Sequence, residues 1–127
     1  MALELEDLTE RIIGAAIAVH RELGPGFLES VYERAMFIEL EYLGLKVEWQ
    51  HRVPIIYRDQ RVGRHRLDLR VESCVIVELK AVEEFRKRHF AIVRSYLKAA
   101  KLRHGLLMNF ADSTLHVKRV ISQHAAG

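Results

Sequence analysis

Two adjacent segments with alternating polar and apolar residues constrain the fold of this sequence more than any other feature. Residues 65–71 and 75–80 both have the period of two that is typical of β-strands, whose successive side chains point to opposite faces. If they form a hairpin with residues 72–73 at its tip, their apolar faces agree when Val71 pairs with Val75. A shift of one residue would mix the faces. The pattern therefore predicts an antiparallel hairpin in a single register.

This register brings two carboxylates together. Asp68 comes directly opposite Glu78, with about 4.5–5.5 Å between paired Cβ atoms, and Lys80 lies two residues after Glu78 on the same side. Charged E-x-K segments are common on exposed strands, but the apolar run at residues 75–77 favours an interior strand with a charged end. Two carboxylates there require a cation between them, and Mg²⁺ prefers such hard oxygen ligands. The carbonyl of Leu79 is a further candidate ligand.

These residue types point to phosphodiester hydrolysis. Mg²⁺ polarises a phosphoryl oxygen and lowers the pKa of a water that it binds, while Lys80 would orient the water or neutralise charge in the transition state. Other chemistries lack a motif. The seven histidines have no zinc-binding spacing, and the sequence contains neither G-x-S-x-G nor a phosphate-binding glycine loop.

Charge is distributed unevenly along the 127 residues, although the net charge is only +3. Residues 1–44 carry three basic and nine acidic side chains, whereas residues 58–103 carry thirteen basic and six acidic ones. A basic stretch of this kind attracts a polyanion, so we expect nucleic acid as the partner. No apolar run approaches the ~20 residues that cross a bilayer. The lone Cys74 cannot form an intramolecular disulfide, which favours a cytoplasmic protein.

Periodicity predicts one α/β domain over residues 1–127, with a mixed central sheet flanked by helices. The expected order is helix, helix, four strands, helix, two strands. Helices are expected at about residues 8–23, 27–43 and 83–102, and strands at 45–50, 53–58, 62–71, 74–80, 105–110 and 115–121. The second helix has one apolar stripe, which consists of Leu28, Val31, Ala35, Ile38 and Tyr42.

Two motifs resemble a known family. Asp68 with Glu78-Leu79-Lys80 looks like the D…E-x-K signature of the PD-(D/E)XK nuclease superfamily, and residues 26–32 match G-x-x-E-x-x-Y, which names its GxxExxY branch. The similarity extends from about residue 8 to residue 120. It implies a restriction-endonuclease-like core and places Glu29 near the metal as a third acidic group.

The leading hypothesis is a nuclease that uses Mg²⁺ or Mn²⁺ to hydrolyse DNA. Asp68, Glu78, Glu29 and the Leu79 carbonyl would hold the metal, and Lys80 would assist catalysis. Candidate nucleic-acid contacts lie on the third helix: Arg86, Lys87, Arg88, Arg94 and Tyr96. Branch members often carry Gln where this chain has Ile92, so a non-catalytic nucleic-acid-binding module on the same fold remains an alternative. A third is an interaction domain that keeps the acids as a structural metal site. The oligomeric state is open, a homo-oligomer included.

Overall fold

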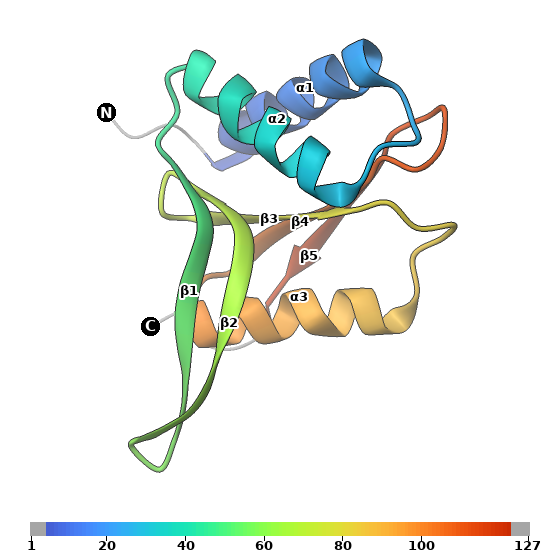
Figure 1. Cartoon of the computed structure of the whole chain (residues 1–127). Coiled ribbons are helices and arrows are strands. Elements are labelled where there is room, and N and C mark those ends of the chain that lie inside the picture. The colour runs from blue at the N-terminus through green and yellow to red at the C-terminus, as the bar shows by residue number, and fades with distance from the viewer. Residues whose placement is uncertain (1–4, 123–127) are drawn as a thin grey trace.

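The computed structural model describes residues 5–122, which form a five-stranded mixed sheet with helices on both faces (Figure 1). Helices α1 (Leu5–Leu23) and α2 (Glu29–Tyr42) cover one face, and α3 (Lys87–Ala100) covers the other. The sheet order is β1-β2-β3-β4-β5, in which only the β3–β4 pair is parallel. The strands are β1 (Val47–Tyr57), β2 (Gln60–Val71), β3 (Val75–Lys80), β4 (His104–Asn109) and β5 (His116–Ile121). This architecture confirms the predicted α/β class.

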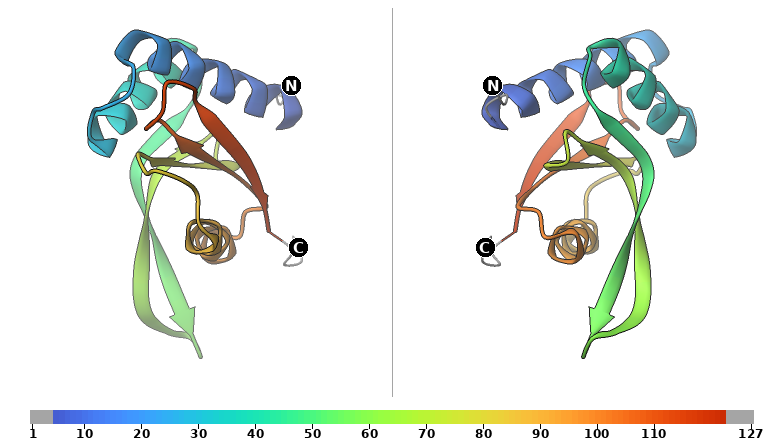
Figure 2. Two further views of the ribbon diagram at one scale, coloured as in Figure 1. Left: turned by 90° about the vertical axis from the view of Figure 1, so that its right-hand side faces the viewer. Right: turned by 90° about the vertical axis from the view of Figure 1, so that its left-hand side faces the viewer.

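Strand β3 lies at the centre of the sheet and of the core. Its side chains are buried from Val75 to Leu79, because helices cover both faces of the sheet at this point. The larger hydrophobic cluster lies between the sheet and α1 and α2, and a smaller one lies under α3. Figure 2 shows the two helical layers from the side, on opposite faces of the sheet. No helix within residues 5–122 is long and apolar enough to cross a membrane.

The hairpin formed by residues 65–80 has the predicted register. Strands β2 and β3 are antiparallel, with Val71 opposite Val75 and Leu69 opposite Val77. Residues 72 and 73 at its tip have φ angles of 51° and 57°, and the turn is closed by a 3.1 Å hydrogen bond from the Cys74 N–H to the Val71 carbonyl.

The order of elements matches the prediction, with one detail changed. The segments expected as separate strands at 45–50 and 53–58 are two halves of the continuous strand β1. Gln50, at the end of the first segment, has a φ of 54°, and the pairing with β2 continues in the same register on both sides of it. The tip of the β1–β2 hairpin is Arg58-Asp59, and both residues have positive φ angles.

The stripe predicted from the apolar residues of α2 does not face the core. Leu28, Ile38 and Tyr42 are 75%, 54% and 84% exposed. The buried stripe is instead formed by Tyr32, Met36 and Leu40, each at 0% exposure. Helix α2 has apolar residues on two sides, so its own sequence does not determine which side is buried. Tertiary contacts decide it: the Tyr32 ring stacks on Phe110, which follows β4, at 4.6 Å between centroids.

Candidate active site

The two carboxylates predicted to face each other lie where β2 and β3 separate. The pairing of these strands reaches Leu69 and Val77 and does not continue to Asp68 and Glu78. There the Asp68 carboxylate replaces a backbone partner, because its Oδ2 accepts a 2.9 Å hydrogen bond from the Leu79 N–H. Asp68 is therefore fixed beside β3 by a bond that the sequence pattern did not indicate.

Burial makes both carboxylates hard to ionise. Desolvation raises the pKa of Asp68 to about 6, although the Leu79 N–H bond opposes the shift. Desolvation, with the charge of Asp68 second, raises the pKa of Glu78 to about 8. The Lys80 ammonium, whose Nζ lies 3.6 Å from Glu78 Oε2, lowers the pKa of Glu78 but offsets only part of the upward shift.

Glu78 also carries an unsatisfied oxygen. The residue is only 4% exposed, and its Oε1 is buried without a hydrogen-bond partner among residues 5–122. A buried carboxylate oxygen without a partner is unfavourable in free energy. The oxygen is therefore available for a cation or a proton donor.

The two carboxylates of Asp68 and Glu78 fit a hard divalent cation. No group of three or more metal-binding side chains occurs in the described part of the chain. Glu29, expected as the third acid, instead accepts a 3.0 Å hydrogen bond from the Ala81 N–H, just beyond the end of β3. Mg²⁺ is commonly bound by one or two carboxylates and several waters, so Asp68 and Glu78 are sufficient in number.

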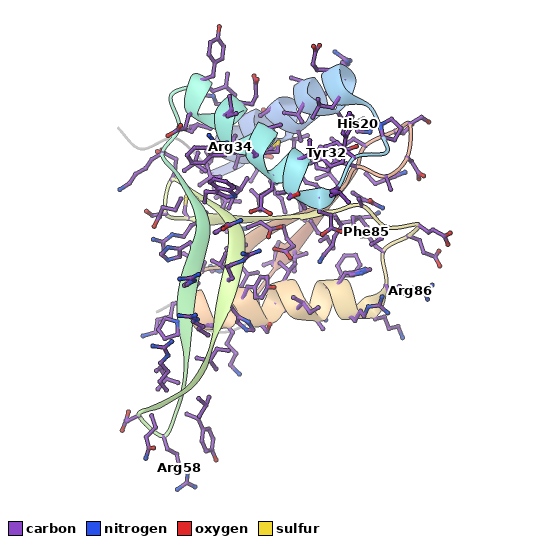
Figure 3. The ribbon with its side chains drawn as sticks, in the orientation of Figure 1. His20, Tyr32, Arg34, Arg58, Phe85 and Arg86 are labelled. Atoms are coloured by element: carbon purple, nitrogen blue, oxygen red, sulfur yellow. The ribbon has the colours of Figure 1, made fainter. Side chains whose placement is uncertain are left out.

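The tyrosine of G-x-x-E-x-x-Y has a structural role here. Tyr32 is fully buried on α2 above the sheet (Figure 3). Its hydroxyl donates a 2.6 Å hydrogen bond to the Gly24 carbonyl and accepts one of 3.2 Å from the Phe27 N–H. These bonds tie the α1–α2 turn to the start of α2, and hence fix the helix end that carries Glu29.

Comparison with known proteins assigns the chain to a family. The family model for the PD-(D/E)XK nuclease superfamily matches residues 6–120. The chain belongs to this superfamily. Among solved structures, the crystal structure of SSO0001 is similar with a TM-score of 0.50 and 12% identity, over 91% of this chain and 65% of that one. The likeness concerns the fold, and this chain spans less than two-thirds of that protein's length. No curated protein matches significantly.

Two buried polar residues that the sequence pattern did not indicate bear on the site. Glu33 is 6% exposed and accepts hydrogen bonds from Trp49 Nε1 and Gln50 Nε2, at 2.6 and 3.1 Å. It lies one turn after Glu29, and its charge contributes to the raised pKa of Asp68. The i, i+4 spacing of the two glutamates was the available signal.

Asn109 is the second such residue, and it holds the segment that follows β3. Its Oδ1 accepts a hydrogen bond of 3.1 Å from the Val82 N–H, and its Nδ2 donates one of 2.8 Å to the Val82 carbonyl. It lies opposite Lys80 in the parallel β3–β4 pair. A lone asparagine at the end of a predicted strand gave no signal of this role.

The third helix brings one of its predicted residues close to the carboxylates. Burial, followed by the charges of Glu78 and Asp68, raises the pKa of Tyr96 to about 12. Ile92 lies one turn earlier and is 36% exposed. The basic residues predicted to contact nucleic acid, on α3 and at its N-cap, are exposed at the surface: Arg86, Lys87, Arg88 and Arg94.

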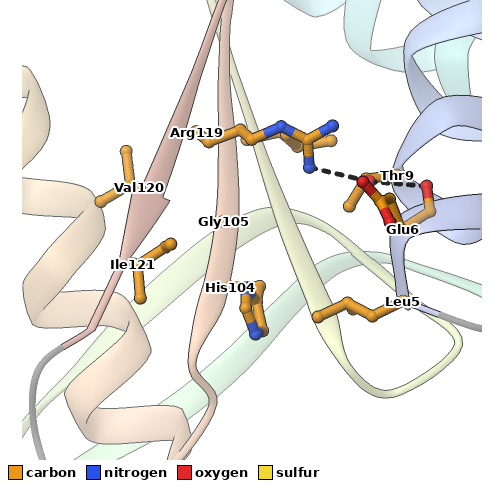
Figure 4. Close-up of a pocket in the computed structure, with 9 residues that line it drawn as sticks. Leu5, Glu6, Thr9, His104, Gly105, Arg119, Val120 and Ile121 are labelled. Carbon is orange, nitrogen blue, oxygen red and sulfur yellow. Dashed lines mark hydrogen bonds between the residues drawn. The ribbon is translucent and has the colours of Figure 1, made fainter.

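A separate cavity of about 320 Å³ lies between the start of α1 and strands β4 and β5 (Figure 4). Arg119 donates a 2.8 Å hydrogen bond to Thr9 Oγ1 in its wall. The cavity is lined by neither Asp68 nor Glu78, so it is not part of the carboxylate site.

Proposed function

We propose that this chain is a divalent-metal-dependent nuclease of the GxxExxY branch that hydrolyses phosphodiester bonds in DNA. The observation that carries the proposal is the buried pair of Asp68 and Glu78, with an unpartnered Glu78 oxygen and Lys80 at 3.6 Å. Residues 1–127 act as one nuclease domain. We place it in the cytoplasm, because its lone cysteine suits a reducing compartment.

Each residue of the proposed site has a distinct role. Asp68, Glu78 and the Leu79 carbonyl would hold Mg²⁺ or Mn²⁺, with Glu29 assisting from the start of α2. The ion, when bound, supplies Lewis acidity toward a phosphoryl oxygen and increases the acidity of water. The Lys80 ammonium stabilises negative charge that develops on the phosphate in the transition state.

Substrate binding falls to the residues around the carboxylates. The Tyr96 hydroxyl, which like any tyrosine hydroxyl is protonated at neutral pH, would donate a hydrogen bond to a phosphate oxygen beside the carboxylates. Arg86, Lys87, Arg88 and Arg94 bind neighbouring phosphates, as charge-assisted hydrogen bonds from arginine are suited to do.

Cleavage of single-stranded and duplex DNA with Mg²⁺ or Mn²⁺ tests the proposal. Lys80→Ala should lower the cleavage rate by about 10²–10³, the effect of removing one transition-state electrostatic contact, and Glu78→Gln, which removes a metal ligand, should lower it at least as much. Both variants should retain DNA binding. Asp68→Asn should behave like Glu78→Gln. Glu22→Gln, an exposed carboxylate on α1, is the matched control and should cleave at the wild-type rate. Cleavage that survives Glu78→Gln would contradict this site.

A non-catalytic nucleic-acid-binding module is the second candidate, and Ile92 is the observation that favours it. The side chain is apolar at a position one turn from Tyr96, where the branch often has Gln. If the wild-type protein binds DNA and cleaves none with either metal, Ile92→Gln becomes the decisive variant. Cleavage by Ile92→Gln would support the proposed nuclease site. No cleavage by this variant would favour the binding module.

A further inference from the structure

The β1–β2 hairpin extends well beyond the helix on which it packs. Its inner part is anchored on α3 through Val53 and Leu67, which belong to the smaller hydrophobic cluster. Its outer end, which carries Arg58, projects past α3 as a two-stranded ribbon (Figures 1 and 3). Tyr57 and Val62 near the tip are 64% and 62% exposed. The outer ribbon therefore contributes little to the core.

One face of this ribbon carries four arginines. Arg52 lies directly opposite Arg66, and Arg64 lies opposite Pro54. Directly opposed residues of an antiparallel pair point to the same face. Arg61 continues the row, because it lines a shallow depression of about 180 Å³ together with Arg52, Pro54 and Arg64. We call Arg52, Arg61, Arg64 and Arg66 the arginine face.

The arginine face has no compensating charge in the described part of the chain. None of its members pairs with a carboxylate, whereas Arg70, farther along β2, makes two 2.8 Å hydrogen bonds to Glu48. Like charges directly opposite each other destabilise a sheet, so the Arg52–Arg66 pair is unfavourable in the isolated protein. Phosphate or base oxygens lying between these guanidinium groups would remove that repulsion. The face is therefore suited to a polyanion.

The dimensions of the ribbon select the kind of polyanion. The major groove of B-DNA, about 12 Å wide, admits a two-stranded β-ribbon. The major groove of A-form RNA is too deep and narrow for side chains to read. From Asp68 to Arg61 strand β2 covers about 23 Å at about 3.3 Å per residue, which is roughly two-thirds of the ~34 Å turn of B-DNA.

We propose that the β1–β2 hairpin is an arm that inserts its arginine face into the major groove of duplex DNA. This proposal rests on the proposed function, because it makes duplex DNA the substrate of the carboxylate site. Because β2 carries both Asp68 and the arginines at 61, 64 and 66, the arm fixes the distance between the bound groove and the cleaved bond. Arginine in the major groove donates two hydrogen bonds to guanine O6 and N7.

A double variant of the arm tests this with the full chain in the absence of divalent metal, so that no cleavage occurs. Arg61→Ala with Arg64→Ala should weaken binding to a guanine-containing duplex at least tenfold. It should also reduce the salt slope of log affinity by about 1.8, at about 0.9 per lost contact. Wild-type protein should protect guanine N7 from dimethyl sulfate, and the double variant should lose that protection. The wild-type protein should also bind duplex DNA more tightly than duplex RNA or single-stranded DNA of equal length.

The matched control removes the same charge elsewhere. Arg21→Ala with Lys118→Ala changes exposed residues on α1 and on β5, the strand at the opposite edge of the sheet from β1. It should retain both affinity and protection, and both double variants should melt within a few degrees of the wild type. Three results would each contradict the proposed arm. They are equal losses of DNA affinity in the two double variants, equal affinity of the wild type for duplex RNA and duplex DNA, and wild-type binding without N7 protection. Its failure is distinguishable from failure of the nuclease, because cleavage by the wild type is measured separately.

Discussion

At Glu78, burial and charge oppose each other, and this conflict defines the site. The alternation of residues 65–80 was sufficient to predict that Asp68 and Glu78 come together, because a one-residue slip would expose the apolar face. The same alternation could not predict the hydrogen bond from the Leu79 N–H to Asp68, which forms where regular pairing ends. Glu33 was missed because its i, i+4 spacing from Glu29 does not by itself distinguish a buried carboxylate from an exposed one, and only the fold brings it near Asp68.

The raised pKa values of this pair predict how stability depends on pH and on metal. Asp68 and Glu78 have pKa values raised from 3.8 to about 6 and from 4.5 to about 8, so the folded state favours their protonated forms. The contribution of the two protonated carboxyls to the free energy of unfolding is full at low pH, and it is lost as pH rises through about 6 and then 8. Without metal, we expect the wild-type melting temperature to fall between pH 5 and pH 8 by several degrees more than that of Glu78→Gln.

Divalent metal should reverse this loss. Mg²⁺ should raise the wild-type melting temperature at pH 8, where Asp68 is ionised and Glu78 is close to its pKa, and much less at pH 5, where both carboxyls are mostly protonated. Thermal scans of both proteins with Mg²⁺ and with a chelator provide the measurement. A pH dependence identical in the wild type and in Glu78→Gln would show that the pair does not carry the effect.

Among the elements, those with a single apolar stripe were the most predictable. Helix α1 buries Leu8, Ile12, Ala16 and Val19, which follow one another at helical spacing in the sequence. Helix α2 did not follow its predicted stripe, because the choice of face depends on Phe110, far away in the sequence. The projection of the β1–β2 hairpin was also unpredictable, since alternation reveals a strand and its register without revealing what lies beyond it.

The hydroxyl of Tyr32 should be needed for the stability of α2 and of the turn before it. Tyr32→Phe leaves the Gly24 carbonyl and the Phe27 N–H without this partner, which should lower the free energy of unfolding by about 1–3 kcal/mol. Tyr42→Phe is the matched control on the same helix: Tyr42 is 84% exposed, and its change should stay within about 0.5 kcal/mol. Urea unfolding of the two variants measures both values. Equal effects would mean that the turn does not depend on the Tyr32 hydroxyl.

On the scale of the whole molecule, charge is separated between the layers of the fold. Helices α1 and α2 contain most of the acidic first third of the sequence, whereas the basic residues gather on the β1–β2 hairpin and around α3. The sequence predicted the basic stretch and its preference for a polyanion. It pointed to α3 for phosphate contacts, but the arginines of the hairpin could be recognised as a group only once the pairing of β1 with β2 placed them on one face.

This separation of charge predicts that nucleic-acid affinity falls steeply with salt. Each neutralised phosphate releases counterions, and log affinity falls against log salt with a slope of about −0.9 per contact. Charge reversal at Arg86 and Arg88 should weaken binding at every salt concentration and reduce the steepness by at least about 1.8, one contact being lost at each position. Arg21→Glu on α1 should leave the slope unchanged, and circular dichroism should show the same fold in both variants. Affinity that does not change with salt, or that is undetectable at low salt, would contradict electrostatic binding of nucleic acid and favour an interaction domain that keeps its acids as a structural metal site.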